Sequence, residues 1–136
     1  MIRRILTLLP VLGAFVLECL PYGAVCVFAP APGETLRQTF SYFDPIPFGY
    51  ANFAPLITGL ITAMTVLFAL VQTVKPDANR RRTIGMLSAV GAVVSVFPGF
   101  SGLQYTTLTG WGITVLLALA AALHLWEAQE REPEKE

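Results

Sequence analysis

The chain has 136 residues, of which 54% are hydrophobic and 13% charged, and its formal net charge is zero at pH 7. A soluble domain of this length cannot bury so much apolar surface, so the composition excludes an ordinary soluble protein and indicates a lipid bilayer as the solvent. We therefore expect an integral membrane protein.

Four apolar runs follow one another along the chain, at about residues 5–29, 53–74, 84–103 and 108–126. A helix needs roughly 20 apolar residues to cross the hydrocarbon region. The first run follows Arg3 and Arg4, which is also how a secretory signal peptide begins, but its length favours an uncleaved helix. We predict an all-α membrane protein, a four-transmembrane-helix bundle in residues 1–126, followed by an acidic cytoplasmic tail in residues 127–136.

The first run contains one acidic residue, Glu18, within the segment FVLECLPYG. This residue lies about 13 positions after Ile5, or roughly 20 Å along a helix. At the same depth the other runs carry hydroxyl residues, namely Thr58 or Thr62, Ser95 and Thr114. We predict an intramembrane polar layer in which Glu18 points toward the other helices and bonds to a hydroxyl group or a backbone carbonyl.

The expected charge of Glu18 follows from its surroundings. No Lys or Arg lies within the four runs, and the single histidine, His124, belongs near the inner surface. A carboxylate without a cationic partner in a medium of low dielectric takes up a proton, so we expect Glu18 to be neutral at pH 7. Three interpretations stay open: a structural hydrogen bond, a site for protons or cations, and an acid facing lipid or the interface near a helix kink at Pro21.

The segment between the first two runs, residues 30–52, is rich in aromatic and polar residues. Residues 35–43 have the composition of a β-strand, as do residues 103–109 between the last two runs. We therefore expect a short extracellular β-hairpin or a sheet patch that joins the two outer loops, similar to the extracellular sheet of claudin-type four-span proteins. Six aromatic residues are expected to form a lid over the bundle: Phe40, Tyr42, Phe43, Phe48, Tyr50 and Phe53.

Small and hydroxyl residues recur every three or four positions in the later runs. Helices in lipid associate where small residues let their backbones approach and where polar side chains bond across the contact. The predicted inner faces are Thr58, Thr62, Thr65 and Gln72 in the second run, Ser88, Gly91, Ser95 and Gly99 in the third, and Gly110, Thr114, Ala118 and Ala122 in the fourth.

The basic residues predict the orientation in the membrane. If the N-terminus is inside, all Lys and Arg residues except Arg37 lie inside, which is the side that basic residues favour. We expect a multi-pass protein of the cell membrane with both termini in the cytoplasm. The cytoplasmic cluster of Arg80, Arg81 and Arg82 is either this topology signal or a contact with anionic lipid headgroups or the acidic tail. It is short and lacks interleaved aromatic residues, so we expect no nucleic-acid partner.

Patterns for catalysis or metal binding are missing from the sequence. With one His and two Cys, the chain has no recognisable ligand set or hydrolytic triad. Cys19 and Cys26 would lie about 10.5 Å apart along one helix, whereas a disulfide needs Cα atoms within about 7 Å. We expect buried free thiols, no metal, no cofactor and no enzyme activity.

Two resemblances bear on function. Four short spans with one acid in the first resemble the small multidrug resistance transporters, in which the position matching Glu18 exchanges protons for cationic substrates. The string FSYFDPIPFGYANFAP, residues 40–55, resembles a segment of small four-span membrane proteins of Gram-positive bacteria, which implies the same fold and no assigned activity. Our leading hypothesis is a structural or accessory partner of another membrane protein or of a second copy of itself. The alternative is a proton-coupled transporter of small cations that uses Glu18, with Thr62, Ser95 and Thr114 along the path.

Overall fold

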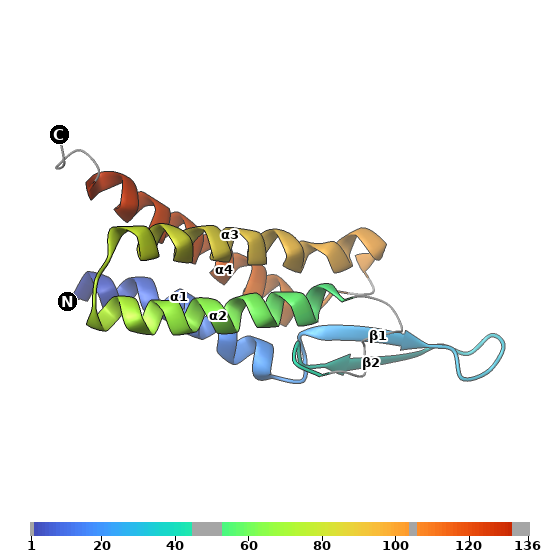
Figure 1. Ribbon diagram of the computed structural model, residues 1–136. Coiled ribbons are helices and arrows are strands. Elements are labelled where there is room, and N and C mark those ends of the chain that lie inside the picture. The colour runs from blue at the N-terminus through green and yellow to red at the C-terminus, as the bar shows by residue number, and fades with distance from the viewer. Residues whose placement is uncertain (1, 45–52, 104–105, 132–136) are drawn as a thin grey trace.

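The computed structural model describes residues 2–44, 53–103 and 106–131, and this part of the chain is mostly helical. The helices are α1 (Ile2–Cys19), α2 (Ala54–Val74), α3 (Ala78–Ser101) and α4 (Leu108–Arg131). Strands β1 (Ala24–Phe28) and β2 (Leu36–Phe40) form one small sheet between α1 and α2. The helices run side by side as a bundle, with the start of α1, the end of α4 and the α2–α3 turn at one end (Figure 1). We call this the basic end, because it carries Arg3, Arg4 and the cluster at residues 80–82.

Three of the described helices are long and apolar enough to cross a membrane: Ala54–Val74, Ala78–Phe100 and Leu108–Glu130. Large apolar side chains lie on their outer surfaces; Leu67, Val93 and Val115 are each more than 60% exposed. Such surfaces are costly in water and match a lipid environment. The helical architecture and the membrane-compatible surface that the composition predicts are therefore present in the structure.

The first helix ends earlier than the apolar run 5–29 predicts. Helix α1 stops at Cys19, and the residues that were expected to continue it form β1 instead. Pro21 has no backbone N–H to extend the helical hydrogen bonds, and Gly23 has a low helix propensity, so the helix ends here rather than kinks. The predicted extent of the first helix is wrong for this part of the run.

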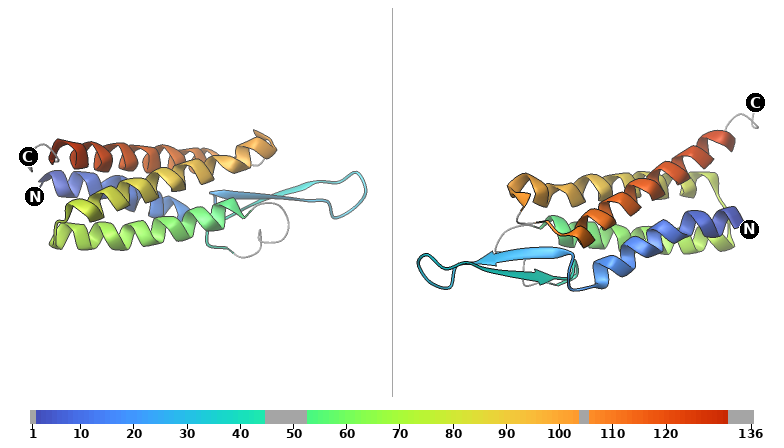
Figure 2. Two further views of the ribbon diagram at one scale, coloured as in Figure 1. Left: turned by 45° about the horizontal axis from the view of Figure 1, so that its top comes forward. Right: turned by 180° about the vertical axis from the view of Figure 1, so that it is seen from behind.

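The small sheet is a β-hairpin formed by the end of the first apolar run and the segment that follows it. Strand β1 pairs antiparallel with β2, with Ala24 opposite Phe40, so of the two predicted alternatives the hairpin is present, and the described part of residues 103–109 forms no strand. Closing the short loop between β1 and β2 costs less chain entropy than pairing segments far apart in the sequence. The second outer segment still reaches the hairpin, because the Arg37 side chain donates a hydrogen bond to the Thr106 carbonyl at 3.1 Å. The hairpin projects beyond the bundle at the end opposite the basic end (Figures 1 and 2).

The core lies between α4 and the helices on either side of it. Ile113 and Leu117 of α4 are fully buried, together with Ala14 of α1 and the ring of Tyr42, which enters from the segment after β2. The predicted inner face of the fourth helix is wrong at Ala118 and Ala122, which are exposed. The buried face of α4 instead contains Ile113, Leu117, Ala120 and Ala121, because each step of four residues turns about 40° beyond a full circle and so drifts off one face of the helix.

Candidate functional site

Glu18 lies in the last turn of α1 and is fully buried inside the bundle. Its carboxyl oxygen Oε1 accepts a hydrogen bond of 2.8 Å from the Thr62 hydroxyl on α2. The other carboxyl oxygen, Oε2, has no hydrogen-bond partner among the described residues. The acid thus points toward a neighbouring helix and links α1 to α2, as its position at the depth of Thr62 predicts.

The segment after β2 closes the bundle beside Glu18. The backbone N–H of Tyr42 donates to the Glu18 carbonyl at 3.0 Å, and the ring of Phe43 packs against Phe15 with centroids 5.7 Å apart. Burial raises the pKa of Tyr42, and a charge on Glu18 would raise it further, so the phenol is neutral at physiological pH. A methyl group at Gly23 would come within 2.8 Å of the Tyr42 ring, so that glycine is what lets the ring enter.

Four of the six residues of the predicted aromatic lid lie in the described part of the chain. Tyr42 is buried in the core, Phe43 packs on α1 and α2, and Phe40 lies against the core cluster, whereas Phe53 is half-exposed. The remaining two aromatic residues, at positions 48 and 50, lie outside the described residues.

The other hydroxyl residues of the predicted polar layer form a second, separate contact. Ser95 of α3 and Thr114 of α4 share a hydrogen bond of 2.7 Å. Both hydroxyls also contact carbonyls of their own helices, and Thr58 bonds to the Ala54 carbonyl within α2 at 2.8 Å. Four of the five predicted residues therefore form two interhelical pairs, Glu18 with Thr62 and Ser95 with Thr114. The fifth, Thr58, is bonded to its own helix.

The three arginines at residues 80–82 do not form one patch. Arg81 is buried and its Nε lies 3.4 Å from a carboxyl oxygen of Glu127, whereas Arg82 is exposed and Arg80 donates to the Lys75 carbonyl. Neighbouring residues on a helix point in directions about 100° apart, which separates the three side chains. Of the alternatives weighed from the sequence, contact with the acidic tail is realised at Arg81, because Glu127 belongs to the last turns of α4.

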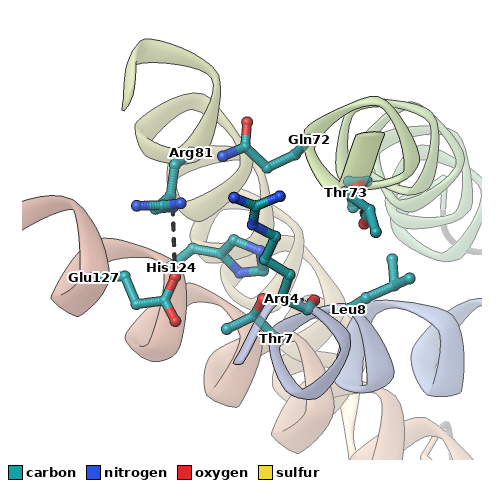
Figure 3. A pocket seen from close by; sticks show the side chains of 9 residues that line it. Arg4, Thr7, Leu8, Gln72, Thr73, Arg81, His124 and Glu127 are labelled. Carbon is teal, nitrogen blue, oxygen red and sulfur yellow. Dashed lines mark hydrogen bonds and ion pairs between the residues drawn. The ribbon is translucent and has the colours of Figure 1, made fainter. Parts of the chain in front are cut away.

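A pocket opens between all four helices at the basic end. Its lining comprises Arg4, Thr7, Leu8, Ala69, Gln72, Thr73, Arg81, His124 and Glu127. Figure 3 shows polar side chains of α1, α2, α3 and α4 converging there. His124 is 3% exposed, and its Nδ1 donates to the Ala120 carbonyl at 2.8 Å, so the ring is fixed inside the bundle at this end.

Sequence reasoning did not find this pocket, although a signal for it exists. Four polar residues of the lining lie within two turns of the basic end of their helix, namely Arg4, Gln72, Arg81 and His124. A comparison of polar residues at equal depth would therefore have grouped them. The same comparison at the depth of Glu18 suggested Thr58 or Thr62, of which Thr62 is the partner in the structure.

Both cysteines are free; Cys26 is buried as expected, whereas Cys19 is exposed. Within the described residues, no group of three or more His, Cys, Asp or Glu side chains is placed to hold a metal ion. Fold and site together define a small helical bundle with membrane-compatible helices joined by interhelical polar contacts. Comparison of the chain with protein-family models, with curated proteins and with solved structures found no match.

Proposed function

We propose that this chain is an integral protein of the cell membrane in which all four helices cross the bilayer and both termini are cytoplasmic. The position of the charges in α1 supports the fourth span. Arg3 and Arg4 lie at the basic end, where headgroups would surround them, and Glu18 is shielded by the bundle. Eighteen residues of helix measure about 27 Å, close to the roughly 30 Å thickness of the hydrocarbon core.

Within this membrane the protein acts as a structural or accessory partner of another membrane component. The single observation that carries this function is the complete burial of Glu18 in its bond to Thr62, a position suited to holding α1 against α2. The projecting β-hairpin supplies a contact surface, since β2 has an outward row of exposed side chains that includes Leu36 and Gln38. A partner at the outer membrane surface is therefore expected to meet the hairpin.

The rival function is proton-coupled transport of a small cation, and one observation favours it. The Glu18 oxygen Oε2 is buried and has no hydrogen-bond partner among the described residues, so it has capacity to bind a proton or a cation. The Thr62 bond and the enclosed position favour the structural role over this one. Glu18→Gln separates the two functions, because the amide keeps the hydrogen bond to Thr62 but cannot bind or release a proton.

The proposed orientation makes a direct labelling prediction. In a Cys19→Ser background, Glu34→Cys in the hairpin loop should react with a membrane-impermeant maleimide in intact cells. Arg82→Cys should react only after the membrane is permeabilised, because the α2–α3 turn is cytoplasmic in this arrangement. Both positions are exposed in the structure, so accessibility within the protein does not separate them. Labelling of Arg82→Cys in intact cells would refute the orientation.

The accessory role is tested by photo-crosslinking in cells. A photoreactive residue at Gln38 of the hairpin should yield a crosslinked band of discrete mass. The matched control is Leu67, 65% exposed on the lipid-compatible face of α2, which should crosslink to lipid and give no such band. If Gln38 gives no protein adduct at the native expression level, or if both sites give the same bands, the hairpin is not a partner surface.

A further inference from the structure

The pocket at the basic end contains a buried side-chain amide, that of Gln72, whose N–H donor has no partner among the described residues. The Gln72 side chain is 6% exposed, and its Oε1 accepts a hydrogen bond of 3.0 Å from the backbone N–H of Asp77. This bond fixes the orientation of the amide, because only the oxygen can accept it. The Nε2 donor therefore points away from Asp77 and toward the side where Arg4 and Arg81 lie (Figure 3), and it has no partner among the described residues. A buried donor left in this way costs free energy unless an acceptor arrives.

Two guanidinium groups border the same space from opposite helices. Arg4 of α1 is half-buried, extends into the pocket between Gln72 and His124, and has no acidic partner within the described part of the chain. Arg81 of α3 is 4% exposed and already paired with Glu127. Two arginines against one glutamate leave a single net positive charge among these groups, so the pocket presents more donors than acceptors.

We propose that this pocket binds a phosphate group that carries one negative charge, held by Arg4 and by the Gln72 amide beside the Arg81–Glu127 pair. Guanidinium and amide N–H groups are the donors that phosphate oxygens prefer. The pocket has room for about one water-sized group, so it holds no whole small molecule and admits an oxygen of a group that stays at its opening. A headgroup phosphate fits such a space better than a large metabolite does.

The place of the pocket in the fold suggests the source of the phosphate. Gln72 lies two residues before the end of α2, and Arg81 is the fourth residue of α3, so the pocket is level with the ends of the membrane-compatible helices. In the proposed orientation this depth coincides with the headgroups of the cytoplasmic leaflet, where anionic phospholipids attract basic residues. A phosphodiester of a phospholipid carries the single charge that the pocket balances, whereas free inorganic phosphate offers the same oxygens from solution.

Binding to the purified full chain tests this site. In nonionic detergent, native mass spectrometry should detect one bound phosphatidylglycerol and no binding of a diacylglycerol with the same acyl chains. Gln72→Glu keeps the acceptor for Asp77 but replaces the donor by a carboxylate, and Arg4→Gln removes one charge. Each variant should weaken phosphatidylglycerol binding about tenfold or more, as expected for the loss of a charge-assisted hydrogen bond. Arg82→Gln, an exposed arginine that does not line the pocket, is the matched control and should bind like the wild type.

The possible outcomes separate the source of the phosphate from the existence of the site. If inorganic phosphate binds instead of the lipid and needs Arg4 and Gln72, the site stands and its ligand is soluble. Equal lipid binding by Arg4→Gln, Gln72→Glu and Arg82→Gln would mean adsorption to general charge and would overturn the proposal, as would no binding of either ligand. Arg4→Gln changes a half-buried residue and keeps the test decisive if Gln72→Glu does not fold. The hairpin crosslinks report on the accessory role independently, so failure of one proposal does not mimic failure of the other.

Discussion

Glu18→Ala should lower the free energy of unfolding by about 2–3 kcal/mol, whereas Glu18→Gln should change it by less than about 1 kcal/mol. Alanine removes the bond to Thr62 and leaves a hole beside Tyr42 and Ala14. Glutamine has the same shape and retains an oxygen that accepts from the Thr62 hydroxyl. Reversible unfolding of the purified protein in detergent or nanodiscs, followed by far-ultraviolet circular dichroism, measures both changes.

Thr62→Val provides the control for the hydrogen bond itself. It keeps the side-chain volume and leaves both Glu18 carboxyl oxygens without a partner, which should cost about 0.6–1.7 kcal/mol, the range of interhelical hydrogen bonds in membrane proteins. In the Glu18→Ala background the same substitution should cost much less, because the bond is already absent. Additive losses in this cycle would show that the contact does not stabilise the bundle.

The same glutamine variant separates the two proposed functions. A structural acid leaves any cellular phenotype of the protein nearly intact in Glu18→Gln, since the hydrogen bond persists. A coupling acid loses proton-linked cation flux in reconstituted vesicles, because an amide cannot release or bind the proton. Cation flux that is present in the wild type and absent in a folded Glu18→Gln protein would replace the accessory role by transport.

Gly85→Ala should destabilise the bundle by about 1–3 kcal/mol through overpacking between α3 and α4. A methyl group at this position would lie 2.7 Å from the Leu125 Cγ and 3.3 Å from the Leu125 backbone nitrogen. The first of these atoms is the branch point of the side chain, and the second is backbone, so neither moves aside without shifting α4. A lower unfolding midpoint and a changed α3–α4 distance, measured between spin labels on the two helices, are the expected results.

Gly99→Ala in the same helix is the matched control. The methyl group there would meet only side-chain atoms at 3.7 Å, an ordinary contact distance. Alanine is a better helix former than glycine by roughly 1 kcal/mol in water, so this variant should be as stable as the wild type or more stable. Equal destabilisation by the two substitutions would mean that the close approach at Gly85 does not limit the packing of the helices.

Sequence reasoning was most successful where composition and depth decide the outcome. The apolar runs beginning near residues 53, 84 and 108 correspond to α2, α3 and α4, because length and hydrophobicity are properties of each segment alone. Counting residues along the helices placed Thr58 or Thr62 at the depth of Glu18, and the structure pairs Glu18 with Thr62. The spacing of hydroxyl residues also suggested that Ser95 and Thr114 face each other across α3 and α4.

Sequence reasoning failed where a single residue or the helical geometry mattered more than the average hydrophobicity of a segment. The residues after Cys19 are as apolar as those before it, yet Pro21 ends the helix and the following residues pair with β2. In α4 the predicted small-residue stripe was wrong at Ala118 and Ala122, because residues four apart drift around the helix by about 40° per step. Neither the β1–β2 pairing nor the buried face of α4 can be predicted from the sequence of one segment alone.

The sequence by itself determined the apolar, membrane-compatible character of this protein's helices and the place of its acid along the first helix, since each depends on hydrophobicity and position along one segment. Only the tertiary structure decided which side chains meet. The convergence of Arg4, Gln72, Arg81 and His124 at the basic end depends on the rotation of four helices about their axes. Those rotations are set by packing between the helices, which no single helix encodes.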